Sequence, residues 1–216
     1  MAAILVKDLR SEFRGRAAIG AVVLFAVVTL VAVSYSIGGF GITPDVQASL
    51  LWVVLFFAAM AGLSRAFVVE TERGTDLALR LTAAPLQVYL GKLLFNLLLL
   101  FVLDTIVILL FQILLPLGEA RWGLLVVALA LGSLGLAAAS TLIAAIVAQA
   151  GVRGALFTVL AFPVLVPVLV AGIGATRKSL ALEDWSSALP EIQLLVSYAG
   201  IMLAVALVLF DHVWRE

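Results

Sequence analysis

An acidic residue inside an apolar stretch is the first candidate for chemistry in this sequence. Asp104 lies near the middle of the run 90–115, which is otherwise almost entirely apolar. An unpaired charge at the bilayer centre costs at least about 2.5–3.5 kcal/mol on insertion scales, so acids there often mark proton or polar-group sites. The alternative is a protonated or hydrogen-bonded aspartate that joins two helices. Asn96 and Gln112 lie eight residues to either side. Eight residues rotate a side chain by about 80° around a helix, which argues against one shared polar path.

The segment 70–85 is the second candidate, because it places many charges between two apolar runs. It also carries leucines at alternate positions 77, 79 and 81. Such a segment can place leucines in a partner's groove and keep charges at the rim, whereas the alternative is a solvated loop. We predict a short helix across the inner membrane face that docks a partner. Its docking residues are Glu70, Glu72, Arg73, Gly74, Asp76, Arg80 and Pro85.

Several kinds of chemistry are excluded by composition. The chain has no cysteine and one histidine, which excludes disulfides, thiolate metal sites and centres with several histidines. It has no G-x-x-x-x-G-K-[ST] sequence to cradle ATP phosphates, and no nucleophile–base pair. Lys+Arg and Asp+Glu balance at 13 each, so net charge does not indicate nucleic acid. We therefore expect no enzyme and no directly bound cofactor or metal, and any energy must come from a partner or an ion gradient.

Six long apolar runs must position these residues. They cover residues 17–38, 46–67, 90–115, 123–147, 155–175 and 192–210. Each approaches or exceeds the about 20 residues that a helix needs to cross a bilayer. Water cannot satisfy the backbone inside that layer, so the runs must be helices. Apolar residues make up 65% of the chain, above the about 45–50% of soluble domains. We predict an all-α integral membrane bundle of six transmembrane helices, forming a single domain over residues 1–216.

The basic residues predict the orientation of this bundle. With a cytoplasmic N-terminus, 10 of the 13 basic residues lie inside, and the outer side holds only Arg121, Arg177 and Lys178. This asymmetry follows the positive-inside rule and predicts that both termini are cytoplasmic. The inner residues are Lys7, Arg10, Arg14, Arg16, Arg65, Arg73, Arg80, Lys92, Arg153 and Arg215.

Residues 3–16 are predicted to form an amphipathic helix at the membrane interface. Leu5, Val6, Leu9 and Phe13 fall within about a 100° arc, and Lys7, Arg10 and Arg14 cluster on another. The cations would face anionic head groups as an anchor for the first span, or would contact a partner. Both roles stay open at this point.

Two features of the later runs predict local geometry. Pro163 and Pro167 lie four residues apart within the fifth run, where each removes a backbone donor, so we expect this helix to kink or break. Small residues on the fourth run favour close helix packing, namely Gly132, Gly135, Ala139 and Ser140. The segment 176–190 is the longest predicted outer segment, and we expect a short surface helix there.

Three stretches carry a resemblance to a known family. Lys7-Asp8-Leu9-Arg10-Ser11-Glu12-Phe13-Arg14 is similar to an opening Lys-Asp-Leu-x-x-Glu-x-Arg pattern. Glu70-x-Glu72-Arg73-Gly74-Thr75, with Ala84-Pro85 and Tyr89-Leu90-Gly91-Lys92, resembles a first cytoplasmic loop and the start of a third span. Pro163-x-x-x-Pro167 resembles a proline pair in a fifth span. The family is the CcmB haem-exporter family, the permease of the cytochrome c maturation system among the ABC-2-type exporters, and its six-span plan covers the whole chain.

The resemblance implies a function that composition alone does not give. It implies a permease domain of the ABC-2-type exporter fold in the bacterial inner membrane, with a cytoplasmic ABC ATPase subunit docked on segment 70–85. It also implies haem-handling membrane subunits and a periplasmic haem chaperone as partners, haem as cargo of the complex, and ATP on the partner. We expect two copies per complex. Two other functions stay open: an ABC-2-type exporter half for a lipid or drug-like solute, and an ion-coupled carrier that uses Asp104.

Overall fold

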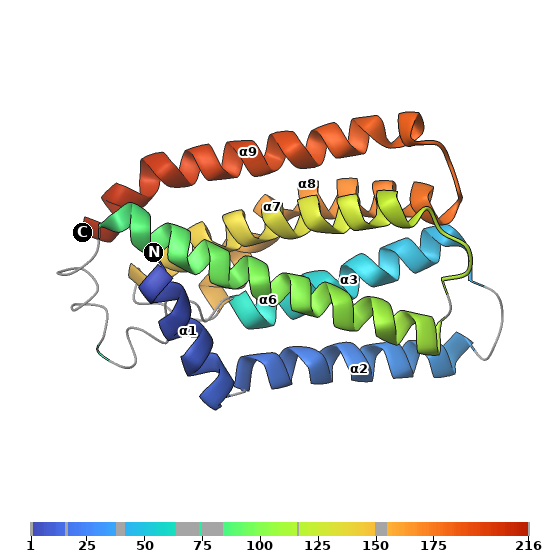
Figure 1. Ribbon diagram of the computed structural model, residues 1–216, viewed down its shortest axis with the longest axis horizontal. Coiled ribbons are helices and arrows are strands. Elements are labelled where there is room, and N and C mark those ends of the chain that lie inside the picture. The colour runs from blue at the N-terminus through green and yellow to red at the C-terminus, as the bar shows by residue number, and fades with distance from the viewer. Residues whose placement is uncertain are drawn as a thin grey trace.

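The computed structural model describes residues 2–15, 17–37, 42–63, 74, 84–115, 117–149 and 155–215. Within these residues the protein has seven helices and no strand, which confirms the all-α prediction. They are α1 (Ala2–Gly15), α2 (Ala17–Ile37), α3 (Pro44–Leu63), α6 (Pro85–Leu114), α7 (Trp122–Gln149), α8 (Ala155–Leu180) and α9 (Trp185–Arg215). The six longer helices follow the long axis of the bundle, and α1 lies obliquely where both chain termini are found (Figure 1). We call the end of the bundle that holds both chain termini the terminal end, and the other end of the bundle the opposite end.

Five helices are long and apolar enough to cross a membrane, namely α3, α6, α7, α8 and α9. Helix α2 has 21 residues, but its apolar stretch among the described side chains is shorter, Val23–Ile37. A crossing helix needs about 20 apolar residues. The multi-pass character is therefore confirmed, whereas the sixth crossing, by α2, stays a prediction.

The connection between α8 and α9 differs from the prediction. The expected long outer segment 176–190 with its own surface helix is wrong, because α8 continues to Leu180 and α9 begins at Trp185. Residues 181–184 form the turn, in which Leu182 has a positive φ of 59°. An ion pair of 2.7 Å between Lys178 on α8 and Glu191 on α9 allows both polar helix ends to stay helical side by side.

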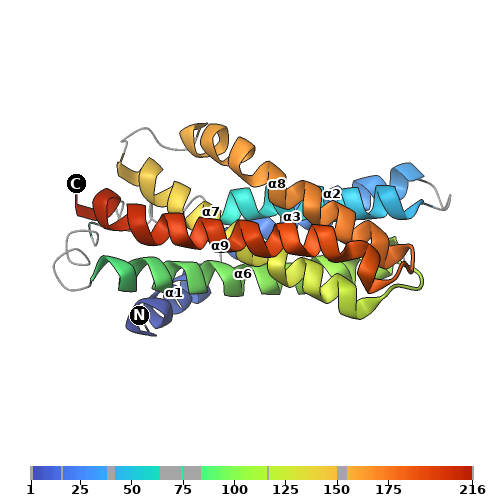
Figure 2. The same cartoon turned by 90° about the horizontal axis from the view of Figure 1, so that it is seen from above.

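Helix α7 is the centre of the bundle. It packs against α8, α9, α6 and α3, and α9 lies over it on the outside of the bundle (Figure 2). Of the apolar stretch of α7, 72% is buried, compared with 17% for α9. Buried alanines 137–139 on α7 leave room for neighbouring helices to approach closely. The small-residue face predicted for this helix is therefore a packing face.

A buried tryptophan joins α3 to α7 and α8. The Trp52 side chain on α3 is 1% exposed, and its indole N–H donates a hydrogen bond of 2.8 Å to Oγ1 of Thr176 on α8. The indole ring lies directly over Gly132 of α7 and Gly172 of α8. A Cβ atom on either glycine would overlap this ring. The glycines therefore form a notch that only a residue without a side chain can provide.

Replacing Gly132 with alanine should destabilise the bundle, because Trp52 cannot avoid the added Cβ without losing its bond to Thr176. Overpacking of this kind costs about 1–3 kcal/mol. The measurement is the thermal midpoint at which purified protein in detergent loses monodisperse elution. Gly20→Ala on α2 is the matched control, since no atom lies within 4 Å of the added Cβ. Equal losses in both variants would contradict the role of the notch.

Candidate functional site

The predicted docking segment reaches the described structure at the start of α6. Gly74 has a φ of +65°, a backbone conformation that favours glycine, and Pro85 is the first residue of α6. Proline suits this position because the first N–H groups of a helix have no intrahelical partner. The other docking candidates lie outside the described residues, so the short docking helix stays a prediction. They are Glu70, Glu72, Arg73, Asp76 and Arg80.

A buried ion pair lies at the terminal end, two turns into α6. Nζ of Lys92 is 2.9 Å from Oδ2 of Asp8 on α1, and both residues are less than 10% exposed. Removing one partner of a buried pair leaves an uncompensated charge, which is strongly destabilising. The pair therefore fixes α1 on α6. It also brings together two of the sequence stretches that carried the resemblance, residues 7–14 and 89–92.

Helix α1 forms where predicted, and the face that it turns to the bundle is not its apolar arc. Ile4 and Asp8 are its buried residues among those whose side chains are described. Val6, from the predicted apolar arc, is 44% exposed. Leu5 and Leu9 are only partly buried. The ion pair of Asp8 with Lys92 determines which face of α1 packs on α6. The apolar periodicity alone could not predict this.

Tyr89 fixes the start of α6 in the bundle. Its side chain is fully buried, and its hydroxyl donates a hydrogen bond of 3.3 Å to the carbonyl oxygen of Ala138 on α7. Its ring packs against Phe210 of α9, with ring centroids 5.3 Å apart. The first turns of α6 are therefore connected to α1, α7 and α9 at once.

Further along, α6 and α7 share a row of buried polar contacts, which we call the polar seam. Nδ2 of Asn96 donates a hydrogen bond of 2.8 Å to Oγ1 of Thr141. Oγ of Ser133 donates one of 2.6 Å to Oδ2 of Asp104. The two residues on α6 and the two on α7 are each eight apart in the sequence, so the antiparallel helices match in register. The equal spacing is a sequence signal that we missed. Asn96 and Asp104 both contact α7 although eight residues rotate a side chain by about 80° around α6.

The polar seam joins helices, and among the described residues part of its hydrogen-bonding capacity is unused. Asp104 is 6% exposed, and among the described residues its second oxygen, Oδ1, has no hydrogen-bond partner. The described residues include no group of three His, Cys, Asp or Glu side chains that could hold a metal ion.

The two prolines lie inside α8 without interrupting it. The helix runs unbroken from Ala155 to Leu180, so a break is excluded, and a kink stays a prediction. Both Pro163 and Pro167 are exposed on the outside of the bundle. Between them, the hydroxyl of Tyr198 on α9 donates a hydrogen bond of 2.7 Å to the carbonyl oxygen of Val164. This bond gives the proline region a direct connection to α9.

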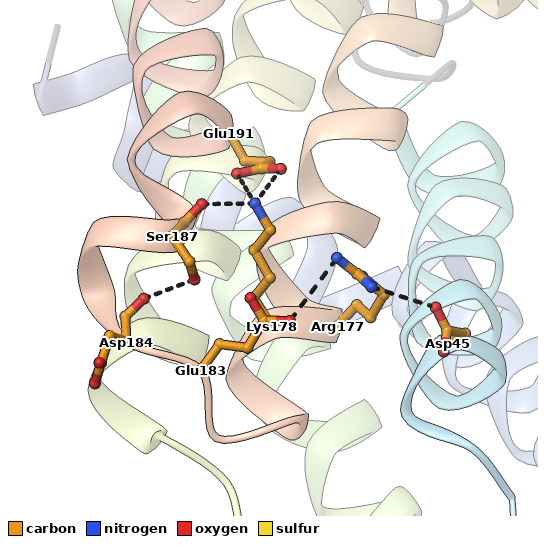
Figure 3. A network of polar contacts seen from close by, with 7 residues as sticks. All are labelled: Asp45, Arg177, Lys178, Glu183, Asp184, Ser187 and Glu191. Atoms are coloured by element: carbon orange, nitrogen blue, oxygen red, sulfur yellow. Dashed lines mark hydrogen bonds and ion pairs between the residues drawn. The ribbon is translucent and has the colours of Figure 1, made fainter.

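A charge network closes the opposite end of the bundle (Figure 3). Nζ of Lys178 lies 2.7 and 2.8 Å from the two carboxylate oxygens of Glu191 and 2.6 Å from the carbonyl oxygen of Ser187. Arg177 is held more loosely, at 3.8 Å from Asp45 and 3.9 Å from Glu183. Exposed pairs at such distances contribute little. The Lys178 contacts are therefore the firm part of the network, and they fix α8 to α9.

Comparison with known proteins gives two matches. The sequence model of the family described as CcmB protein matches residues 1–211. Heme exporter protein B of Paracoccus denitrificans (strain Pd 1222) is 28% identical to this chain over 194 residues, which are 88% of each chain. The family match extends from α1 into α9 and includes the ion pair and the polar seam.

Asp104→Asn should keep the bundle nearly as stable as the native protein, because an amide oxygen can still accept the bond from Ser133. Asp104→Leu removes that acceptor and should assemble poorly, with a loss of about 0.6–1.7 kcal/mol, the range for polar contacts between membrane helices. Thermal unfolding in detergent and the yield of assembled protein measure both variants. Ser133→Ala, which removes the same bond from the α7 side, should resemble Asp104→Leu. An asparagine variant as unstable as the leucine variant would show that the charge, rather than the hydrogen bond, is needed.

Proposed function

The chain belongs to the CcmB protein family, and from this premise we propose that it is the permease subunit of an ABC transporter for c-type cytochrome biogenesis. In this proposal a cytoplasmic ATPase subunit hydrolyses ATP. The permease uses that energy for haem export or for release of the haem-loaded periplasmic chaperone. The name of the Paracoccus relative, Heme exporter protein B, supports haem as the cargo of the complex. The fold would be that of the ABC-2-type exporters, with six spans.

The observation that carries the proposal is the set of contacts at the start of α6. The segment 70–85 leads directly into this helix, whose first turns contact α1 through Lys92 and contact α7 and α9 through Tyr89. A force passed by a docked ATPase subunit to the start of α6 would therefore reach three helices. This is what an energy-coupling subunit requires.

The residues of the chain favour a mechanical role over haem ligation. Haem iron in proteins is held by His, Cys, Met or Tyr side chains. The chain has no cysteine, and its single histidine, His212, follows the last apolar run. Tyr89 and Tyr198 both use their hydroxyl groups in bonds between helices. We propose that haem-handling membrane subunits and the periplasmic chaperone hold the haem, and that this subunit binds no cofactor of its own.

The charge distribution supports a bacterial inner-membrane location with both termini in the cytoplasm. Both termini lie at one end of the bundle (Figure 1). Arg121, Arg177 and Lys178 lie at the opposite end, which would face the periplasm under the positive-inside rule.

Two other functions have less support. An exporter half for a lipid or drug-like solute would need a large polar cavity at a subunit interface. An ion-coupled carrier would need an accessible Asp104, and transport would continue without ATP. Asp104 is instead buried against Ser133. An Asp104→Asn complex that assembles fully but does not support cytochrome c maturation would favour a proton- or cargo-carrying role.

We propose that two copies assemble over an ATPase pair, since an ATPase dimer offers two docking clefts and this chain has one principal docking segment. Closed two-fold association of this chain would supply one docking segment to each of the two clefts. The exposed side of α9 suits a contact between copies, because Gln193, Ser197 and Gly200 lie on it. Small and polar residues on lipid-facing surfaces favour helix association in membranes.

Charge reversal at Glu72 and Asp76 together should weaken binding of the ATPase subunit without unfolding the bundle, because both acids belong to the predicted docking segment. The measurement is recovery of the ATPase subunit with affinity-tagged permease, together with ATP turnover of the complex. Charge reversal at Glu119, an exposed acid at the opposite end, is the control and should leave both quantities unchanged. A Glu72/Asp76 variant with full recovery and turnover would rule out this docking surface.

The proposed assembly predicts two copies of this chain for two ATPase subunits. Native mass spectrometry of the purified complex measures the ratio directly. A complex with one copy per ATPase pair, and a different subunit in the second cleft, would overturn the two-copy proposal while leaving the docking segment in place.

A further inference from the structure

The turn between α8 and α9 places a leucine where the backbone favours glycine. The N–H of Leu182 donates a hydrogen bond of 3.2 Å to the carbonyl oxygen of Ser179. The N–H of Glu183 donates one of 3.0 Å to the carbonyl oxygen of Lys178. These two bonds form a Schellman motif, whose left-handed residue is usually glycine. Leu182 occupies that position with a φ of 59°, a conformation that is strained for a residue with a Cβ atom.

Arg121, the residue before α7, holds this strained turn in place. Its Nε donates a hydrogen bond of 2.9 Å to the carbonyl oxygen of Leu182, and its Nη2 lies 2.8 Å from Oδ1 of Asp184. The hydroxyl of Ser179 donates a bond of 2.9 Å to the carbonyl oxygen of Arg121, whose own N–H donates one of 3.0 Å to the carbonyl oxygen of Ser179. Strained residues persist where their surroundings fix them, and they cluster at sites of binding and catalysis. The turn therefore holds Leu182 in one direction.

Packing within the chain does not account for the leucine. Leu182 is 44% exposed and lies outside the apolar core of the described residues. It also lies between two apolar spans, of which one ends at Leu180 and the next begins at Trp185. Trp185 is 45% exposed and lies beside Gly123, next to the exposed Trp122. We call the exposed apolar side chains of Leu182, Trp185 and Trp122 the turn patch.

The charges around the turn patch are mainly acidic. Apart from the Lys178–Glu191 pair, the described residues at the opposite end carry four acidic side chains and two arginines. They are Asp45, Glu119, Glu183 and Asp184, with Arg121 and Arg177. Glu183 and Asp184 belong to the turn itself (Figure 3). Because like charges repel, this rim is unfavourable beside anionic lipid and complements a basic protein surface.

We propose that the turn patch is the docking site of a protein whose surface has an apolar pocket with basic residues at its rim. The proposal rests on the function proposed above, in which haem-handling subunits and a periplasmic chaperone work with this chain. Interface cores are rich in aromatic residues and have a polar rim, as the turn patch has. Contact with hydrocarbon is non-directional, so contact with lipid requires no strained leucine. A leucine held in one direction instead suits a pocket of fixed shape, since less ordering is needed on binding.

A cysteine at Ser186, which is exposed next to Trp185, reports whether the turn patch is covered. The chain has no native cysteine to compete. The chain alone in phosphatidylcholine nanodiscs is compared with the complex purified with the ATPase, the haem-handling membrane subunits and the chaperone. A water-soluble maleimide should label Ser186→Cys at least about tenfold more slowly in the complex, the factor that burying one leucine contributes. Ser36→Cys, exposed on α2, is the control and should label equally in both.

Two substitutions of Leu182 separate docking from folding. Leu182→Gly relieves the strain, so the chain alone should unfold at the native temperature or above it, whereas the protection of Ser186→Cys in the complex should be lost. Leu182→Met keeps a large apolar side chain and should keep the protection. A residue with a structural role alone would show the opposite order, with stability lost and protection unchanged.

The remaining outcomes distinguish the occupants of the turn patch. Slow labelling of Ser186→Cys in nanodiscs without any partner would show that lipid covers the patch, and would overturn the proposal. Full protection in the Leu182→Gly complex would also overturn it. Recovery of the ATPase and the other subunits is measured in the same preparation. Full recovery without protection would reject this docking site alone, whereas a chain that recovers none of these partners would reject the proposed function as well.

Discussion

The hydrocarbon layer cannot solvate polar groups, and the arrangement of this bundle depends on that constraint. Each buried contact between two polar side chains described above joins two different helices: Asp8 with Lys92, Asn96 with Thr141, Ser133 with Asp104, and Trp52 with Thr176. Apolar side chains gain little by moving from lipid to protein, so they cannot select partners among helices. The polar pairs select them instead. Three of the four involve α6 and give this helix its fixed position.

The helices can satisfy those pairs only because their backbones come close together. Small residues on α7 and α8 permit this approach, most clearly where Trp52 lies over Gly132 and Gly172. Gly135 serves a similar purpose, since a Cβ there would lie 3.0 Å from Val168 and 3.2 Å from Tyr198. Close packing at α7 therefore allows the hydrogen bonds between helices to form. The result is a rigid centre with α9 and α1 on its outside.

The sequence predicts the helical class and the multi-pass character well, because length and hydropathy depend on single segments. It does not predict which side chains meet. The Asp8–Lys92 pair joins residues more than 80 positions apart, and the turn at 181–184 depends on a lysine and a glutamate from two separate helices. Asp104 was identified as a candidate from its position within an apolar run alone. Its partner, Ser133, is an ordinary serine in an apolar helix, and only the equal eight-residue spacing on α6 and α7 points to the pairing.

The ion pair between Lys178 and Glu191 has a consequence for how the chain enters the membrane during synthesis. A single charged residue near the end of a nascent hydrophobic segment opposes its partition from the translocation channel into lipid. Lys178 and Glu191 lie on consecutive helices joined by a short turn, and together they carry no net charge. Helices α8 and α9 are therefore suited to leave the channel as one hairpin rather than one after the other. Release of α8 would then wait until the ribosome has made α9.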